Sequence, residues 1–289
     1  MKNNSFTARH FIMIPFQDEN FIASYENLCE KLKSEKPENF DPELLQKPSK
    51  LHISALIFDL KEDPVKVNKV CQIMKELQDD IKNLAEGDIT YKFGGYGVFD
   101  SYQKARVIYS KMEEDPSYFK MEKIIDLIIK KLLQEGIIYD SELKNLHVNK
   151  TGSNDNPFYK IEMHLTLMNT TFLNKILKKQ KKKPIKNFDA TKIYECISGE
   201  KIVDCPLKKI DFCVLREDKN TGKYEVVESF DLVWIIKKEK YISFLEINKW
   251  YIIDLSIILL LIFEYISLHI YYTILLKKWI YIYNSNSFS

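Results

Sequence analysis

Two short segments of this 289-residue sequence each place a histidine two positions before a hydroxyl residue. His52 precedes Ser54 in the first segment, and His164 precedes Thr166 in the second. The residues beside and between them are apolar: Leu51, Ile53, Met163, Leu165 and Leu167. Because side chains alternate between the two faces of a strand, the pattern predicts two short strands. Each would carry its histidine and hydroxyl on one face and apolar residues on the other.

These four side chains suit phosphoester chemistry if the two strands lie side by side. A reaction at phosphorus needs one group to take a proton from the attacking oxygen and another to protonate the leaving oxygen. Imidazole, with an unperturbed pKa of about 6.5, can take either role near neutral pH. The hydroxyls would donate hydrogen bonds to the non-bridging oxygens, where negative charge gathers in the transition state. The sequence therefore predicts catalytic His52 and His164, phosphate-binding Ser54 and Thr166, and no metal or other cofactor.

A single His-x-Ser/Thr pattern is weak evidence, but two copies stand in similar apolar strands of a chain with five histidines. The alternative interpretation is that both histidines are hydrogen-bonded strand residues without a catalytic role. His10, which begins the apolar run 11–16, is a third candidate for the same cleft. For His10 the alternative is likewise a structural role within its strand.

The segments around the two motifs add a family resemblance. They comprise residues 9–15, 48–52, 105–109, 164–170 and 187–190. With the paired motifs, they resemble the two-histidine (2H) phosphoesterase superfamily, which includes 2′-5′ RNA ligase-like proteins and cyclic phosphodiesterases. More narrowly, the chain is similar to the phosphoesterase domain shared by A-kinase anchor protein 7 and the first subunit of the activating signal cointegrator complex. The resemblance covers roughly residues 8–235.

This resemblance implies a bilobal α+β fold, with two antiparallel sheets flanking a cleft and helices outside. It implies a metal-independent phosphoesterase acting on 2′-5′ linkages or 2′,3′-cyclic phosphates of RNA. The alternative is a nucleotide- or nucleic-acid-binding subunit of a transcription-coactivator or alkylation-repair complex, with little catalysis. RNA or an AMP-like nucleotide is then the expected ligand, and a cointegrator-type complex is the expected protein partner.

Apolar periodicity predicts the elements that must position the motifs. The predicted strands are 11–16, 51–60, 89–93, 105–112, 210–215 and 224–236, together with the second histidine segment. The predicted helices are 20–34, 64–81 and 118–135, the last capped by Ser117 and ended by Gly136. A glycine-rich turn or bulge is expected between strands 89–93 and 105–112, which would pair, and a polar loop is expected over 149–157. Helices alternating with antiparallel strands indicate an α+β plan.

A run of lysines follows the second histidine strand. Its members include Lys178, Lys179, Lys181, Lys182 and Lys183. Blocks of like charge are usually solvated loops, which is one interpretation. The other is an electrostatic contact to nucleic-acid phosphates near the mouth of the cleft, or a nuclear-import signal.

Overall composition points to no particular partner, since the formal net charge is only +2. Five cysteines without a Cys-x-x-Cys pair argue against a disulfide framework and a zinc site. They favour a reducing compartment, and we expect the nucleus or cytoplasm.

Beyond the predicted phosphoesterase-like domain (1–238), residues 239–289 form a hydrophobic tail. Within it, the stretch 252–276 is long enough to cross a bilayer, although Asp254, Glu264 and His269 interrupt it. Membrane association through this tail is one hypothesis. A helix packed on the domain and an unusual extension are the alternatives.

Overall fold

The computed structural model describes residues 10–61, 63–218, 221–232, 268 and 272–278. The chain divides into two units, residues 1–234 and 235–289. The membrane-spanning segment predicted at 252–276 lies outside the described residues, apart from 268 and 272–276. Among the residues that are described, no helix is both long enough and apolar enough to cross a bilayer.

Seven strands form one antiparallel sheet in the order β11-β10-β1-β2-β8-β5-β4. Their bounds are β1 (His10–Pro15), β2 (His52–Phe58), β4 (Phe93–Val98), β5 (Val107–Met112), β8 (His164–Asn169), β10 (Lys209–Glu217) and β11 (Tyr224–Asp231). Two small pairs complete the strands: β3 (Ile89–Tyr91) with β9 (Cys205–Leu207), and β6 (Asn149–Gly152) with β7 (Pro157–Lys160). The predicted α+β fold with antiparallel sheets is confirmed.

The two sheets expected on either side of the cleft are joined into this single sheet by a narrow connection. Strands β2 and β8 pair only at Ile53 and Leu165, whereas β1 pairs with β2 along its whole length. The sheet therefore has two halves, β11-β10-β1-β2 and β8-β5-β4, and we call the β2–β8 junction between them the seam.

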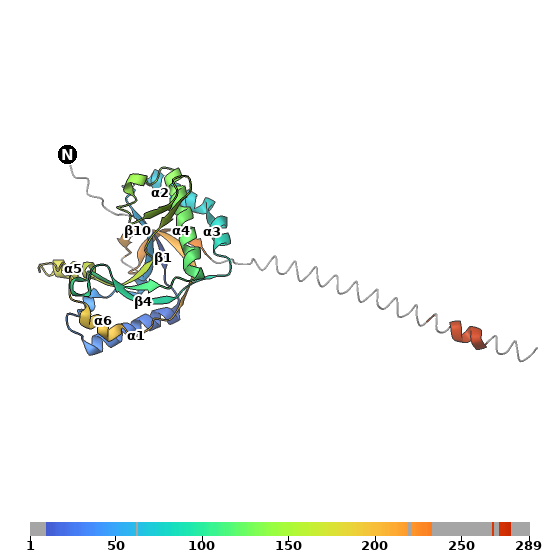
Figure 1. Ribbon diagram of the computed structural model, residues 1–289, viewed down its shortest axis with the longest axis horizontal. Helices are drawn as coiled ribbons and strands as arrows, with labels where there is room; N and C mark the ends of the chain where they lie inside the picture. The colour runs from blue at the N-terminus through green and yellow to red at the C-terminus, as the bar shows by residue number, and fades with distance from the viewer. Residues whose placement is uncertain (1–9, 62, 219–220, 233–267, 269–271, 279–289) are drawn as a thin grey trace, which may run out of the picture. The chain divides into compact units, whose positions relative to one another are not determined.

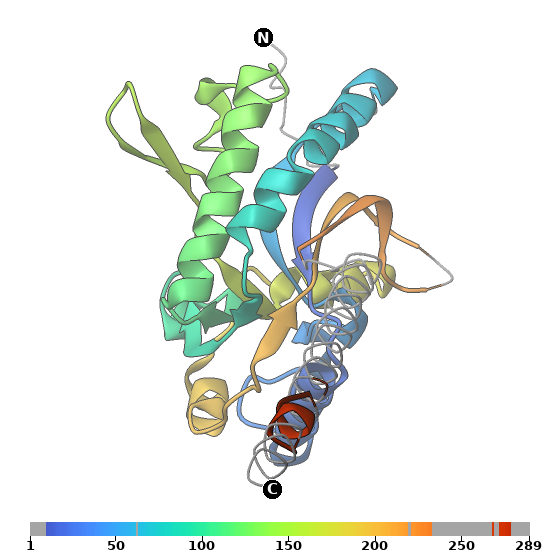
Figure 2. The same ribbon diagram turned by 90° about the vertical axis from the view of Figure 1, so that its right-hand side faces the viewer.

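Six helices and four 3₁₀ turns accompany the strands within residues 10–232, and residues 272–278 are also helical. The helices are α1 (Glu19–Glu35), α2 (Pro64–Glu76), α3 (Gln78–Leu84), α4 (Pro116–Gln134), α5 (Thr170–Lys179) and α6 (Thr191–Ile197). The 3₁₀ turns are η1 (Pro42–Leu44), η2 (Pro48–Lys50), η3 (Tyr102–Lys104) and η4 (Asp140–Glu142). Helices α2, α3 and α4 gather at one end of residues 10–232, and α1 and α6 pack together at the other (Figures 1 and 2). The single helix predicted over 64–81 is thus two helices, α2 and α3.

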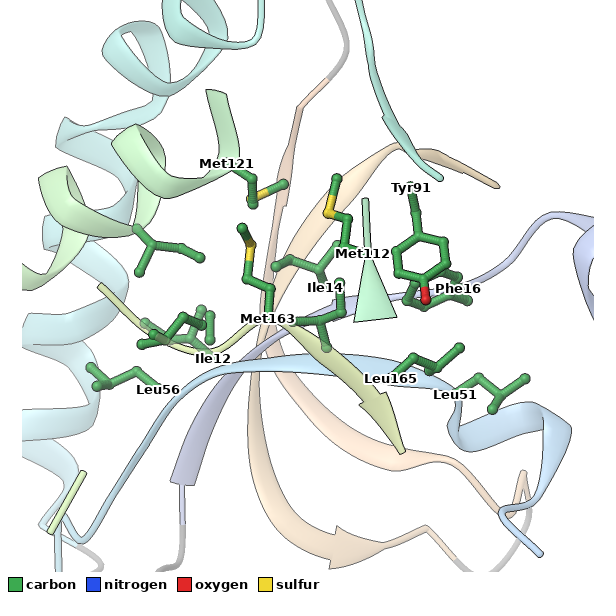
Figure 3. Packing of buried hydrophobic residues seen from close by; sticks show 14 of the residues in the cluster. Ile12, Ile14, Phe16, Leu51, Leu56, Tyr91, Met112, Met121, Met163 and Leu165 are labelled. Atoms are coloured by element: carbon green, nitrogen blue, oxygen red, sulfur yellow. The ribbon is translucent and has the colours of Figure 1, made fainter. Parts of the chain in front are cut away.

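Burial of the apolar face of β2 and β8 determines which way the histidines point. Four apolar residues adjoin the histidines, and each is at most 3% exposed: Leu51, Ile53, Met163 and Leu165. Figure 3 shows three of them within one cluster that also holds side chains from β1, β5 and α4. Burying such a side chain contributes about 1.5–3 kcal/mol, and a one-residue slip would expose all four. The histidines are therefore held on the opposite face.

The start of α4 differs from the prediction by its capping residue. Asp115, not Ser117, is the N-cap, because its Oδ1 accepts a hydrogen bond from the Tyr118 backbone N–H at 3.0 Å. The Ser117 hydroxyl instead accepts from the Thr90 backbone N–H at 3.2 Å. The carboxylate also suits the positive end of the helix dipole, which favours aspartate at this position. Gly136 follows α4 with a φ of +66°, as predicted for a helix-ending glycine.

The two predicted strands that flank the glycine-rich segment, 89–93 and 105–112, pair with each other only at Phe93 and Met112. Strand β3 pairs with β9, and the glycine-rich segment is itself strand β4, which pairs with β5. Its register shifts between Phe93 and Tyr96, so the bulge alternative is correct. At Gly97, a Cβ atom would lie 2.9 Å from the Tyr109 side chain. Glycine at this position therefore leaves room for the Tyr109 ring.

Two segments expected to be irregular have regular structure in part. The polar loop predicted at 149–157 contributes to the β6–β7 hairpin. The lysine run begins within α5, whose N-cap Asn169 accepts a hydrogen bond from the Thr171 backbone N–H at 2.8 Å. Polar composition does not distinguish a loop from an exposed hairpin or helix face, and the loop interpretation holds for residues 181–183 of the lysine run.

Candidate active site

The seam brings the four candidate residues together on one face of the sheet. Ile53 pairs with Leu165 in antiparallel register, and the residues on either side of this pair are His52 and Ser54 on β2 and His164 and Thr166 on β8. These neighbours of the paired residues lie on the face opposite to Ile53 and Leu165. All four side chains are half-buried, in contrast to the buried pair between them. The geometry therefore places two imidazoles and two hydroxyls around one small space.

The two imidazoles are oriented by the same kind of backbone contact. Nδ1 of His52 lies 2.7 Å from the carbonyl oxygen of Lys50, and Nδ1 of His164 lies 2.8 Å from that of Glu162. A carbonyl can only accept, so each Nδ1 carries the proton and the neutral ring keeps its lone pair on Nε2. Both rings therefore use Nδ1 for orientation and keep Nε2 for proton transfer. Because backbone carbonyls make these contacts, they cannot be predicted from the residue types in the sequence.

His52 is also held by its paired hydroxyl and by two aromatic rings. Its Nε2 lies 3.0 Å from Oγ of Ser54, whose hydroxyl donates to the neutral ring. The ring of Tyr224 approaches edge-on with a centroid separation of 5.4 Å, and that of Phe11 lies at 5.5 Å. These aromatic residues come from β11 and β1, which are far from His52 in sequence, so the motif alone does not predict them.

His164 has a similar aromatic setting in the other half of the sheet. The Tyr109 ring lies 5.2 Å from it and the Phe99 ring 4.9 Å, and the two aromatic rings stack on each other at 4.6 Å. Phe99 is 49% exposed, so an open aromatic surface borders His164. The Tyr109 hydroxyl donates to Oε1 of Glu162 at 3.1 Å. Tyr109 is the last residue of segment 105–109, which carries part of the family resemblance. Nothing else in the sequence indicates that Tyr109 lies beside His164.

The charges beside the two histidines differ in sign. Lys50, only 8% exposed, lies over the Tyr224 ring at 5.0 Å and forms an ion pair with Glu217 at 2.5 Å. Hydrogen bonds from Lys47 and Lys50 lower the pKa of Glu217 to about 2. On the other side, the Glu162 carboxylate lies near His164. His52 thus has a cation beside it, and His164 an anion.

Both histidines hold a proton less readily than free imidazole. Burial lowers the pKa of His52 to about 4, and the positive charges of His164 and Lys50 act in the same direction. Burial also lowers the pKa of His164, but there the Glu162 carboxylate opposes the shift. Without a ligand, both rings are therefore neutral near pH 7.

This environment predicts the titration of the two imidazoles in an NMR experiment. In protein free of phosphate, His52 should titrate near pH 4 and His164 below the ordinary value of 6.5. Because an anion between the rings favours imidazolium, added inorganic phosphate should raise both midpoints. Spectra of His52→Asn and His164→Asn assign the signals. Midpoints at or above about 6.5 in the phosphate-free protein would contradict the predicted desolvation.

The third candidate, His10, lies away from the seam. It is 4% exposed, pairs with Phe58 and stacks on Phe212 at 5.8 Å. The residue of β1 that pairs with His52 is Pro15, at the other end of the strand. The structural interpretation therefore fits His10.

The lysine run is exposed and lies at the end of α5, the helix that begins where β8 ends, at the end of the strand away from His164. Lys178 and Lys179 end α5, and residues 181–183 belong to the loop after it. Asn174 fixes this loop by exchanging two 2.8 Å hydrogen bonds with the Ile185 backbone. Within the described part of the chain, no contact joins these lysines to the four seam residues. Their assignment as contacts to nucleic acid stays a prediction.

The seam residues supply proton carriers and hydrogen-bond donors to an anion. Within the described ranges, no group of three or more histidine, cysteine, aspartate and glutamate side chains is arranged to hold a metal ion. The chemistry that these four side chains can perform by themselves is proton transfer across a bound phosphate.

Comparison with solved structures finds chains of low identity that align over nearly their whole length. E. coli LigT complexed with 3′-AMP is 11% identical, with a TM-score of 0.44 over 79% of this chain and 99% of that one. TT0787 of Thermus thermophilus is 15% identical, with a TM-score of 0.45 over 78% and 97%. Kluyveromyces marxianus Usb1 with uridine monophosphate is 10% identical, with a TM-score of 0.41 over 78% and 97%.

Among curated proteins, none matches the chain well enough to count as a relative. Comparison with protein families does give a match, to the AKAP7 2′5′ RNA ligase-like domain, over residues 8–232. This range takes in both histidine strands and every strand of the seven-stranded sheet. The chain therefore belongs to the AKAP7 2′5′ RNA ligase-like domain family, and the resemblance to 2H phosphoesterases is confirmed.

Proposed function

We propose that this protein is a metal-independent phosphoesterase that acts on RNA phosphodiesters, either 2′-5′ linkages or 2′,3′-cyclic phosphates. The observation that carries the proposal is the arrangement at the seam: His52, Ser54, His164 and Thr166 share one face, and both imidazoles are oriented through Nδ1. Family membership supports the coarser statement, a phosphodiesterase that processes RNA. Two proton carriers that flank one phosphate supply both proton transfers that the reaction needs.

In this mechanism the phosphate lies between the two imidazoles. Ser54 and Thr166 donate hydrogen bonds to its non-bridging oxygens. The neighbouring ribose hydroxyl, or water, forms the new bond to phosphorus and gives its proton to Nε2 of one histidine. The bond to the leaving oxygen breaks, and that oxygen takes a proton from Nε2 of the other histidine.

The surroundings of the rings favour His52 as base and His164 as acid. Lys50 and burial keep His52 unprotonated, and its Nε2 lone pair already accepts a hydrogen bond from Ser54. The Glu162 carboxylate stabilises protonated His164, and the bound phosphate adds a second negative charge beside it. Acid–base catalysis requires a base that is unprotonated and an acid that is protonated when the substrate is bound. These surroundings meet both requirements.

A panel of oligonucleotides incubated with chelator tests the function. The panel contains 2′-5′ and 3′-5′ dinucleotides and a 2′,3′-cyclic nucleotide, with products identified by chromatography and mass. We expect turnover of at least one member in chelator, and the product phosphate shows which bond breaks. Activity that appears only after a divalent metal is added would contradict the mechanism. Tight nucleotide binding without turnover of any member would favour the nucleotide-binding subunit instead.

A further inference from the structure

An open pocket of about 600 Å³ lies beside the His52 half of the seam. We call it the side pocket. Its lining includes Met13, Lys50, Lys209, Asp211, Lys223 and Tyr224. Tyr224 and Lys50 also contact His52, through the edge of the ring and through the Lys50 carbonyl. The side pocket therefore adjoins the His52 side of the seam, although neither His52 nor His164 lines it.

The lining combines an apolar surface with three lysines. Met13, Val226 and the Tyr224 ring offer apolar contact to a flat group. Two of the lysines are matched by carboxylates: Lys209 pairs with buried Asp211 at 3.0 Å, and Lys50 pairs with Glu217. The exposed side chain of Lys223 adds a third positive charge.

The size and lining fit one nucleoside. Pockets for small ligands measure about 300–1,000 Å³ and are mostly apolar with a few polar groups. A nucleobase can lie against the ring of Tyr224 and the side chain of Met13, and the lysines favour the attached phosphate.

We propose that the side pocket receives the nucleoside that bears the attacking hydroxyl. This inference rests on the proposed function, in which His52 takes the proton from that hydroxyl. The attacking group must then lie on the His52 side of the phosphate, and its nucleoside continues into the adjoining pocket. The leaving nucleoside lies on the His164 side, where the exposed ring of Phe99 offers a stacking surface. The site thereby fixes the direction in which a phosphodiester binds.

Two isomeric nucleotides of equal charge distinguish the two sides. In adenosine 2′-monophosphate the phosphate stays with the nucleoside that would attack, so this ligand should fill the side pocket. In adenosine 5′-monophosphate the phosphate is on the oxygen of the leaving nucleoside, so this ligand should leave the side pocket empty. Neither is a phosphodiester, so calorimetry can use the full wild-type chain.

Val226→Trp blocks the side pocket from an exposed position. Val226 is 44% exposed on β11, and aromatic residues are well tolerated in strands. The variant should weaken binding of the 2′ isomer by about tenfold or more, the usual scale of a lost base contact, and change the 5′ isomer by less than about threefold. Leu215→Trp is the matched control, because Leu215 is 46% exposed on β10 and does not line the pocket. It should leave both affinities unchanged.

The assignment would be overturned if Val226→Trp weakened binding of both isomers equally, or if it weakened binding of neither. If Val226→Trp does not fold, Val226→Tyr gives the same test with a smaller ring and should weaken the 2′ isomer selectively. The proposed function fails separately. Isomer-selective binding without turnover of any diester would remove the catalytic proposal and keep the pocket. Turnover of a diester without isomer-selective binding would keep the catalytic proposal and remove the assignment of the pocket.

Discussion

His164→Ala should lose its activity on natural phosphodiesters and keep most of it on an ester with a good leaving group. General acid or base catalysis contributes about 10²–10⁴-fold, so either His52→Ala or His164→Ala should reduce turnover of a 2′-5′ dinucleotide by that factor. The double variant should fall little further, because the two groups act in one transition state.

The leaving group separates the two roles. In adenosine 2′-(4-nitrophenyl phosphate), nitrophenolate departs without needing a proton, so the acid is dispensable and the base is not. His164→Ala should then turn this ester over within about tenfold of wild type, while His52→Ala keeps its full loss of about 10²–10⁴-fold. The measurement is kcat/KM by absorbance of released nitrophenolate, beside kcat/KM for the dinucleotide.

His147→Asn is the control for loss of an imidazole that acts on His164 only through its charge, which lowers the pKa of His164. His147 is exposed and has a φ of +56°, a conformation that asparagine tolerates. This variant should retain activity on both esters. If the nitrophenyl ester restored the activity of His52→Ala and not that of His164→Ala, His52 would be the acid and His164 the base. Unchanged dinucleotide turnover by the double variant would remove both histidines from the mechanism.

The placement of the histidines could be predicted from the sequence because it depends on local alternation. Leu51 and Ile53 beside His52, and Met163 and Leu165 beside His164, must be buried, and a strand then turns its other side chains away from the core. That the two strands adjoin is a non-local fact, which only the family resemblance implied. The structure adds the register, through the pairing of Ile53 with Leu165.

The groups that tune the imidazoles could not be predicted in this way. The carbonyl of Lys50 has no residue-type signature, and the Tyr224 ring reaches His52 from a strand more than a hundred residues later. The Tyr109 ring fits only because Gly97 has no side chain. In the sequence Gly97 cannot be distinguished from a glycine in a turn. Such contacts arise from tertiary packing, so patterns within one element do not contain them.

Removal of either hydroxyl at the seam should lower kcat by about 10²–10³-fold, the effect of losing one donor to a developing anion. Ser54 and Thr166 flank the Ile53–Leu165 pair on the face that carries both histidines, so we expect each hydroxyl to reach the oxygens of a phosphate held between the rings. The charge on these oxygens grows in the transition state, and the loss should therefore appear more in kcat than in KM.

Conservative exchanges distinguish this role from packing. Ser54→Ala and Thr166→Ala remove the donor, whereas Ser54→Thr and Thr166→Ser keep it and change only a methyl group. Both side chains are half-buried on the open face, so none of the four changes should create a core cavity. We expect the exchanges to stay within about tenfold of wild type in kcat while the alanine variants lose about 10²–10³-fold. If the exchanges were as inactive as the alanine variants, shape and not hydrogen bonding would explain these positions. If the alanine variants were fully active, the phosphate would be held by other groups, and Lys50, the cation beside His52, would be the first candidate.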